Sequence, residues 1–239
     1  MRPVTRGSAP VPINKYEDAK PHLVRQLGSY CSYCERHIPT NLAVEHIQPK
    51  GLGKYAHLET SWENFLLACV NCNSAKGDTD VEPVNYYLPD RDNTYVPFCY
   101  LESGLVEPSN TLGMDERAIA EATIDLVGLN KNFEDDDELL IAAIDRFAQR
   151  AAAQKLASDS LRDYEQAPIP QVHALLVRLA CASGFFSIWM STFSAHAGMQ
   201  HAFIDGFSGT EKGCFDPMTA HPISPRNPVP PNLVDGGKI

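Results

Sequence analysis

Two Cys-x-x-Cys pairs constrain the fold of this 239-residue chain more than any other feature of its sequence. Cys31 and Cys34 form the first pair, and Cys69 and Cys72 form the second. Two thiolates at this spacing can bind one tetrahedral ion, and a second pair completes four soft ligands. A redox disulfide needs only one such pair, so two pairs favour a zinc site. Because four thiolates close the coordination shell, the zinc is expected to be structural and to join two distant turns.

The segment between the pairs has strand and loop patterns followed by a short helix. We expect a strand at residues 42–47, a loop at 49–53, a strand or turn at 62–68 and a helix at 73–77. The first strand carries Glu45 and His46 among apolar and β-branched residues, and Gly77 is a typical end for the helix. This order places a Glu-His pair between the two halves of the zinc site.

Together these elements resemble the zinc-containing branch of the HNH endonucleases. The matching strings are Cys31-Ser-Tyr-Cys34, Val44-Glu-His-Ile47, Trp62-Glu-Asn-Phe-Leu-Leu67 and Cys69-Val-Asn-Cys72-Asn73-Ser-Ala-Lys76-Gly77, in this order. In that family a ββα-metal unit cuts phosphodiester bonds of nucleic acids with one divalent cation. The resemblance implies an α+β fold, with a ββα-metal core stabilised by a four-cysteine zinc site.

The family roles carry over to four positions. His46 matches the first family histidine and would be the general base that activates water. Glu45 occupies the acidic position before it, where the family usually has the shorter Asp, and would be a metal ligand. Asn64 matches the middle asparagine, which holds the loop that orients the histidine. Asn73 stands where many members have a second histidine and would be the other metal ligand.

The chemistry of these side chains suits those roles. A neutral imidazole can take a proton from water at neutral pH, because its ordinary pKa is about 6.5. The carboxylate of Glu45 and the amide oxygen of Asn73 form a hard oxygen site that suits Mg²⁺ or Mn²⁺ and leaves room for phosphate oxygens. Lys50 and Lys76 lie beside these elements, so their ammonium groups are candidates for binding backbone phosphates.

The same residues also have non-catalytic interpretations. His46 by itself, on an apolar strand, would more often be a core histidine, and Glu45 would be an exposed strand carboxylate. Asn73 could cap a helix, since Asn is a favoured N-cap residue. Most lysines are solvated. His37 and His57 fall in polar segments, and we expect them at the surface.

The remaining cysteines and the compartment follow from spacing and composition. Cys99, Cys181 and Cys214 have no partner at ligand spacing, so we expect buried free thiols. Seven cysteines are an odd count, which favours thiols and metal over disulfides. No apolar run approaches the roughly 18 residues of a membrane span, and residues 1–8 lack the apolar stretch of a signal peptide. We expect a cytoplasmic protein with no membrane partner.

The acidic residues are concentrated outside the nuclease-like segment. The chain has a net charge of −10, whereas residues 1–80 hold 9 Lys and Arg against 8 Asp and Glu. Affinity for nucleic acid depends largely on neutralising phosphates, so this chain is not expected to bind DNA tightly unaided. A partner that delivers or activates the nuclease is therefore expected.

The rest of the chain has mainly helical patterns. We expect a hairpin at 100–108 with Ser-Gly in its turn, helices at 114–127, 136–163 and 171–197, and a proline-rich extended or disordered segment at 222–230. The third helix is apolar on most faces, which favours a place in the core over an interface. The predicted domains are a nuclease domain at 1–110, a helical, partner-docking domain at 111–221 and a tail at 222–239.

A narrower resemblance covers roughly the first 130 residues. The opening Met1-Arg-Pro-Val-Thr-Arg-Gly7 and the strings at 28–36, 41–50 and 123–130 resemble the PtuB-type HNH proteins of Septu and retron-associated anti-phage systems. This resemblance implies an effector nuclease held by a PtuA-type ATPase until infection is sensed. In retron versions a reverse transcriptase and its RNA-DNA product also take part.

Other functions stay open on the sequence. The target is DNA or RNA, including tRNA. A stand-alone restriction-type or homing-type HNH nuclease would cut DNA without a partner. A zinc-stabilised adaptor would bind without cutting, and Glu45 and His46 would then be incidental.

Overall fold

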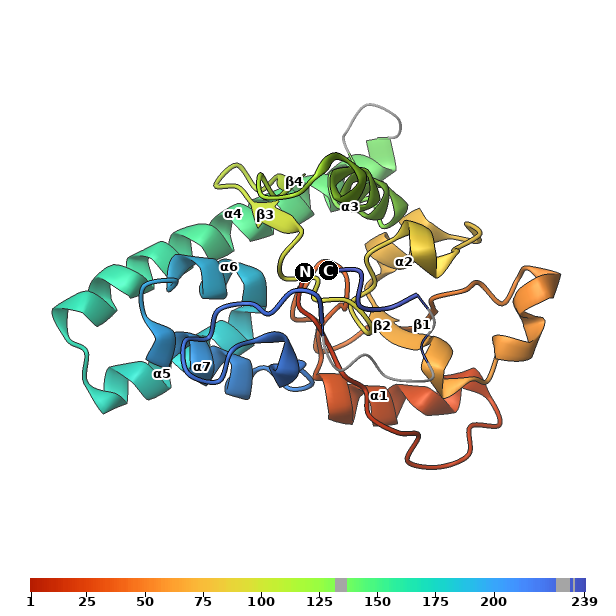
Figure 1. Ribbon diagram of the computed structural model, residues 1–239, viewed down its shortest axis with the longest axis horizontal. Helices are drawn as coiled ribbons and strands as arrows, with labels where there is room; N and C mark the ends of the chain where they lie inside the picture. Colours follow the sequence, from red (N-terminus) through yellow and green to blue (C-terminus); the bar gives the residue numbers. More distant parts are fainter. Residues whose placement is uncertain (132–136, 227–232, 234) are drawn as a thin grey trace.

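The computed structural model describes residues 1–131, 137–226, 233 and 235–239, with the backbone alone for 137–145. The first half contains α1 (Lys20–Leu27), β1 (Ala43–His46), β2 (Phe65–Ala68), α2 (Val70–Lys76), β3 (Phe98–Tyr100), β4 (Val106–Pro108) and α3 (Met114–Leu126). The second half contains α4 (Asp137–Gln166), α5 (Pro170–Ser183), α6 (Phe186–Thr192) and α7 (Ala197–Gly206). Short 3-10 helices are η1 (Tyr16–Ala19), η2 (Gly53–Leu58), η3 (Trp62–Asn64), η4 (Pro83–Asn85) and η5 (Lys212–Cys214). Figure 1 shows β1, β2 and α2 toward one end of the molecule and α5 to α7 toward the other, with α4 running from beside α3 to that second end.

The expected order of strand, loop, strand and helix is confirmed, and with it the α+β class. Strands β1 and β2 pair antiparallel, with His46 opposite Phe65. Helix α2 follows β2 after one residue, Cys69, whose Sγ accepts a 3.4 Å hydrogen bond from the backbone N of Cys72 and so caps the helix. The helix ends at Gly77, whose φ of +50° is a conformation that glycine adopts without strain.

Two hydrophobic clusters form the core. The first is built around α1, β2, α3 and the turns that carry the four clustered cysteines, and it includes Leu23, Phe65 and Ile124. The second is built from α5, α6 and α7 around Trp189 and Phe203. Helix α3 lies after the predicted domain boundary at residue 110, yet it packs in the first cluster. The domain boundaries themselves stay a prediction.

The single helix predicted at residues 171–197 is wrong, because the structure breaks it into α5 and α6. Gly184 has a φ of +78° and Phe185 a φ of +59°, neither of which continues a right-handed helix. At Gly184 the chain passes so close to the first zinc turn that a Cβ would lie 2.7 Å from the Glu35 carbonyl oxygen. The backbone N of Phe185 donates to that same oxygen at 2.9 Å. The helix is thus interrupted at the point where the helical region contacts the turn after Cys34.

The other expected elements are mostly confirmed. The hairpin and α3 form at the expected places, and α4 runs over Asp137–Gln166, while Asp136 lies outside the described residues. The apolar residues of α6 are all buried, whereas in α5 only Leu176 and Ala180 are buried and Leu175 is 54% exposed. Among the described residues, no helix combines the length and apolar character needed to cross a membrane.

The expectation of three buried thiols holds for one of them. Cys214 is buried and Cys181 is half-buried, but Cys99 is exposed. Successive side chains on a strand point to opposite faces, and Phe98 takes the buried face of β3. Cys99 therefore points to solvent.

Both ends of the chain pack against the loop at residues 89–93. The backbone N of Val4 donates to the Pro89 carbonyl at 2.7 Å, and the Ile239 carbonyl accepts from the backbone N of Asn93 at 2.8 Å. Buried Arg226 donates to the carbonyls of Val4 and Pro89. The N and C labels accordingly lie together at the centre of Figure 1. The described part of the proline-rich segment is thus anchored to the body of the protein.

Candidate active site

The four cysteines of the two pairs meet in one buried cluster. One ligand atom from each of Cys31, Cys34, Cys69 and Cys72 lies within 4.8 Å of all the others. The Sγ atoms of Cys34 and Cys69 are 3.7 Å apart. A tetrahedron with Zn–S bonds of about 2.3 Å has S–S edges of about 3.8 Å. The donor set and its spacing therefore fit a four-thiolate zinc ion.

Local backbone geometry places the first pair. The turn is closed by hydrogen bonds of 3.0 Å from the Glu35 N to the Cys31 carbonyl and from the Cys31 N to the Arg36 carbonyl. The backbone N of Ser32 donates to the Leu67 carbonyl at 2.8 Å, which joins this turn to β2. Since the second pair opens α2, the cluster fixes the turn, the strand and the helix relative to one another.

His46 is the last residue of β1 and is held from several sides. Its Nε2 lies 2.9 Å from the Glu59 carbonyl oxygen. A carbonyl can only accept, so Nε2 carries the proton and Nδ1 keeps its lone pair. The rings of Tyr16 and Phe65 both meet the imidazole edge to face, with centroids 5.1 Å away. Burial lowers the pKa of His46, which keeps the ring neutral and able to accept a proton at neutral pH.

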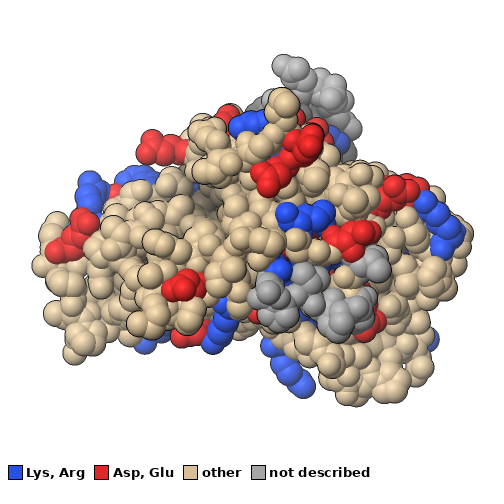
Figure 2. Space-filling view, viewed as in Figure 1, with Lys and Arg blue, Asp and Glu red and all other residues tan. Residues whose placement is uncertain are grey.

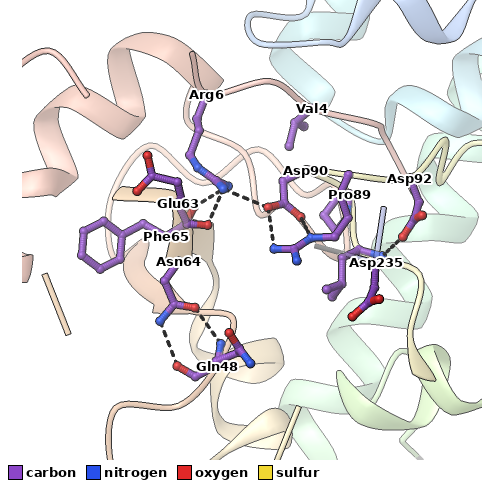
Figure 3. Close-up of polar contacts among 12 residues, drawn as sticks. Val4, Arg6, Gln48, Glu63, Asn64, Phe65, Pro89, Asp90, Asp92 and Asp235 are labelled. Atoms are coloured by element: carbon purple, nitrogen blue, oxygen red, sulfur yellow. Dashed lines mark hydrogen bonds and ion pairs between the residues drawn. The ribbon is translucent and has the colours of Figure 1, made fainter. Parts of the chain in front are cut away.

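Asn64 fixes the backbone that follows His46. Its Oδ1 accepts from the Gln48 N and its Nδ2 donates to the Gln48 carbonyl, both at 2.9 Å (Figure 3). The Asn64 carbonyl also accepts from the backbone N of Ile47 at 2.9 Å. Asn64 thus lies behind the site and clamps the loop, which is the position that the family resemblance implies for it.

Five of the other residues singled out in the sequence line one pocket of about 200 Å³. They are Glu45, His46, Lys50, Asn73 and Lys76, and Tyr16 joins them from η1. The pocket therefore collects the expected base, both expected metal ligands and two cations from β1, the following loop and α2.

Glu45 and Lys76 form a buried ion pair in this pocket. Both side chains are 2% exposed, and Lys76 Nζ lies 3.0 Å from Glu45 Oε1. The same ammonium donates to the His46 carbonyl at 2.9 Å. Burial raises the pKa of Glu45, and the charge of Lys76 opposes this rise. Among the described residues, no donor meets hydrogen-bond geometry at Glu45 Oε1, so its contact with the Lys76 ammonium is an ion pair only.

These contacts change two interpretations made from the sequence. Glu45 is not an exposed strand carboxylate, because it is 2% exposed. Lys76 is not solvated, because its charge faces Glu45 inside the protein rather than the surface. A hard divalent cation prefers carboxylate and amide oxygens, and Glu45 and Asn73 supply one of each in this pocket.

Asn73 and Lys50 occupy different parts of the pocket wall. Asn73 is half-buried inside α2, and Cys69 takes the N-cap, so the interpretation of Asn73 as a helix cap is wrong. Lys50 is 36% exposed and lies 3.3 Å from Glu59 Oε1. Its Nζ also lies 3.5 Å from the centre of the Tyr16 ring. Lys50 is thus a surface cation at the rim of the pocket.

His37 and His57 lie outside the pocket. His57 is exposed, as expected, whereas His37 is half-buried.

The sequence did not reveal Tyr16 or the Glu59 carbonyl. Tyr16 lies far before the motif in the chain and touches His46 only through the fold. The contribution of Glu59 to His46 is a backbone oxygen, which any residue supplies. Motif spacing carries no information on either contact.

Comparisons with known proteins agree with this geometry. Residues 31–79 match the HNH endonuclease family. A protein named "Retron Vc95 putative HNH endonuclease", from Vibrio cholerae serotype O1 biovar El Tor, is 27% identical over 109 residues, which cover 44% of this chain and 53% of that protein. The match thus spans about half the length of this curated relative. Residues 31–79 of this chain, which contain the cysteine cluster and His46, thus match an HNH endonuclease domain.

Proposed function

We propose that this chain is a metal-dependent HNH endonuclease that hydrolyses phosphodiester bonds of nucleic acids as the effector of a prokaryotic anti-phage system. The observation that carries the proposal is the pocket in which neutral His46 lies beside Glu45 and Asn73. The agreement of this pocket with the HNH match over residues 31–79 supports it.

In this mechanism His46 is the general base. Its Nδ1 takes the proton of a water molecule while the water oxygen attacks the phosphorus and the bond to the leaving oxygen breaks. The Glu59 carbonyl keeps the tautomer that leaves Nδ1 free. Glu45 and Asn73 would hold Mg²⁺ or Mn²⁺, which supplies neutralisation of the charge on the phosphate and the leaving oxygen. Lys76 opposes the rise in the pKa of Glu45 that burial causes, and Lys50 would contact a backbone phosphate at the rim.

The charge distribution supports a delivered nuclease. The chain is acidic, with a sequence pI of about 5.2. On the face drawn in Figure 2, Lys and Arg side chains lie among Asp and Glu side chains rather than in one broad basic area. Tight binding to a phosphate backbone needs many neutralised phosphates. A partner therefore has to bring the substrate to the pocket.

The partner that we propose is a PtuA-type ATPase. The resemblance to PtuB-type proteins and the relative named for a retron support this proposal. In a retron version, the reverse transcriptase and its RNA-DNA product would belong to the same assembly. The cysteines form no disulfides among the described residues, which suits a reducing compartment such as the cytoplasm. Both DNA and tRNA are candidate substrates.

Partner binding is tested by co-expression with the products of neighbouring genes. We expect a tagged copy of this chain to retain an ATPase through size-exclusion chromatography, and the complex to cut nucleic acid faster than the chain alone. Efficient cutting by the isolated chain without a retained partner would contradict the proposed assembly and favour a stand-alone nuclease.

His46→Ala should lower Mg²⁺- or Mn²⁺-dependent cleavage of plasmid DNA or tRNA by at least about 100-fold, since a positioned general base contributes on that order. His57→Ala is the matched control, because His57 is exposed and lies outside the pocket, and it should keep wild-type activity. Cleavage is followed on gels. Full activity of His46→Ala would rule out the proposed base and bring the adaptor function forward.

The purified chain should hold one zinc ion, measured by elemental analysis. Cys69→Ser should lose the zinc and melt at a much lower temperature, because a structural zinc supplies folding free energy on the order of 10 kcal/mol. Cys214→Ser is the control: this thiol is buried but belongs to neither pair, and its loss should leave the zinc in place. A Cys69→Ser protein with full zinc and an unchanged melt would show that the cluster is no zinc site.

Lys76→Met and Lys50→Met should distinguish the role of Lys76 in stability from the role of Lys50 in substrate binding. Removing Lys76 leaves Glu45 buried without its cation, so the free energy of unfolding should fall by about 3–5 kcal/mol in urea titrations. Removing Lys50 breaks a surface pair and should change stability by less than about 1 kcal/mol. Lys50→Met should instead raise the KM for cleavage. Equal, small effects of both variants on stability would contradict the buried pair.

A further inference from the structure

A buried guanidinium from the N-terminal segment holds the backbone on both sides of Asn64. Arg6 is 5% exposed. Its Nη1 donates to the Phe65 carbonyl at 2.9 Å, and its Nη2 donates to the Glu63 carbonyl. Figure 3 shows the guanidinium directed at these two carbonyls and at Asp90. Because Glu63 and Phe65 flank Asn64, Arg6 fixes both ends of the tripeptide that carries the loop clamp.

The carboxylate of Asp90 anchors this guanidinium. Asp90 Oδ2 lies 2.9 Å from Arg6 Nη2 and 3.1 Å from Arg91 Nη2. Burial by itself would raise the pKa of Asp90, but the two arginines lower it to about 2. Asp90 is therefore ionised at neutral pH and still has Arg91 when Arg6 is removed. The planar fork of Arg6 can donate to a carboxylate and two carbonyls at once, which a single ammonium does less well.

A second contact joins the same two segments. The indole Nε1 of Trp62 donates to the Gly7 carbonyl at 2.9 Å. Residues 6–7 are thus bonded to η3 and the start of β2 by both a side chain and a backbone oxygen. Among the described residues, no residue before Tyr16 lines the pocket, so residues 6–7 do not touch the site directly.

We propose that Arg6 is a positioning residue of the active site, acting from outside the HNH domain through Asn64 and Gln48 on His46. The path has two hydrogen-bonded steps and then follows the chain. Arg6 holds the carbonyls around Asn64, Asn64 clamps both backbone polar groups of Gln48, and Gln48 lies two residues after His46. The proposal rests on the proposed nuclease function. Small displacements of a catalytic group cost on the order of 100-fold in rate.

The test compares Arg6→Met with Arg2→Met in the full chain, in whichever preparation the wild type cleaves. Arg2 is the matched control, since it is 3% exposed and also donates to backbone carbonyls. Its hydrogen-bond partners are Leu27, Phe207, Ser208 and Thr210, none of which belongs to η3. Both substitutions remove a buried guanidinium from the same N-terminal segment, so both should lower the melting temperature.

Only Arg6→Met should affect the site. We expect kcat to fall by about 10- to 100-fold with KM within about 3-fold of wild type, because substrate contacts stay in place while His46 loses its support. Hydrogen–deuterium exchange of peptides spanning residues 46–50 should also speed up in Arg6→Met and not in Arg2→Met. This second readout needs no substrate.

Arg6→Lys is a second variant, for use if Arg6→Met does not fold. It keeps a cation beside Asp90 but cannot hold both carbonyls, so it should also lower kcat and speed up exchange at residues 46–50. Wild-type kcat and exchange in Arg6→Lys or Arg6→Met would overturn the proposal, and so would equal losses in Arg2→Met. If the wild type cleaves no nucleic acid, the proposed function fails, whereas the exchange data still decide whether Arg6 supports the loop.

Discussion

The fold around His46 depends on the cluster of Cys31, Cys34, Cys69 and Cys72. They lie within 4.8 Å of one another and join a turn, a strand and a helix that are otherwise short. Strands β1 and β2 have four residues each, and a two-stranded sheet of that length is marginal by itself. Four buried thiolates also repel one another without a cation. A zinc ion bound by the cluster would offset that repulsion and fix the frame around His46.

Within that frame, the proposed reactive groups and the groups that support them occupy separate places. Glu45, His46 and Asn73 face the pocket, whereas Asn64 lies behind the loop and acts on its backbone. The buried Lys76 links the two sets, because one ammonium serves the Glu45 carboxylate and the His46 carbonyl. A longer acid in the place of the usual Asp is accommodated by turning inward to this lysine.

Features that depend on local sequence pattern could be predicted, whereas features that depend on contacts between distant parts of the chain could not. Cysteine spacing and strand periodicity predicted the cluster, β1, β2 and α2. The apolar run from α5 into α6 keeps helical spacing, so the break at Gly184 follows only from its contact with the Glu35 turn. Likewise, a lysine in a last helical turn is usually solvated, and burial of Lys76 depends on β1 packing beside α2. Arg6 acts over contacts far apart in the chain, which no motif encodes.

We propose that Glu45 and Asn73 hold one catalytic cation beside His46 while the cysteines hold a separate zinc ion. Anomalous diffraction from Mn²⁺-soaked crystals, recorded at the manganese and zinc edges, tests this arrangement. We expect a manganese peak in the pocket within bonding distance of both oxygen ligands, and a zinc peak at the centre of the four Sγ atoms. A manganese peak bound elsewhere, with Lys76 still paired to Glu45, would contradict it.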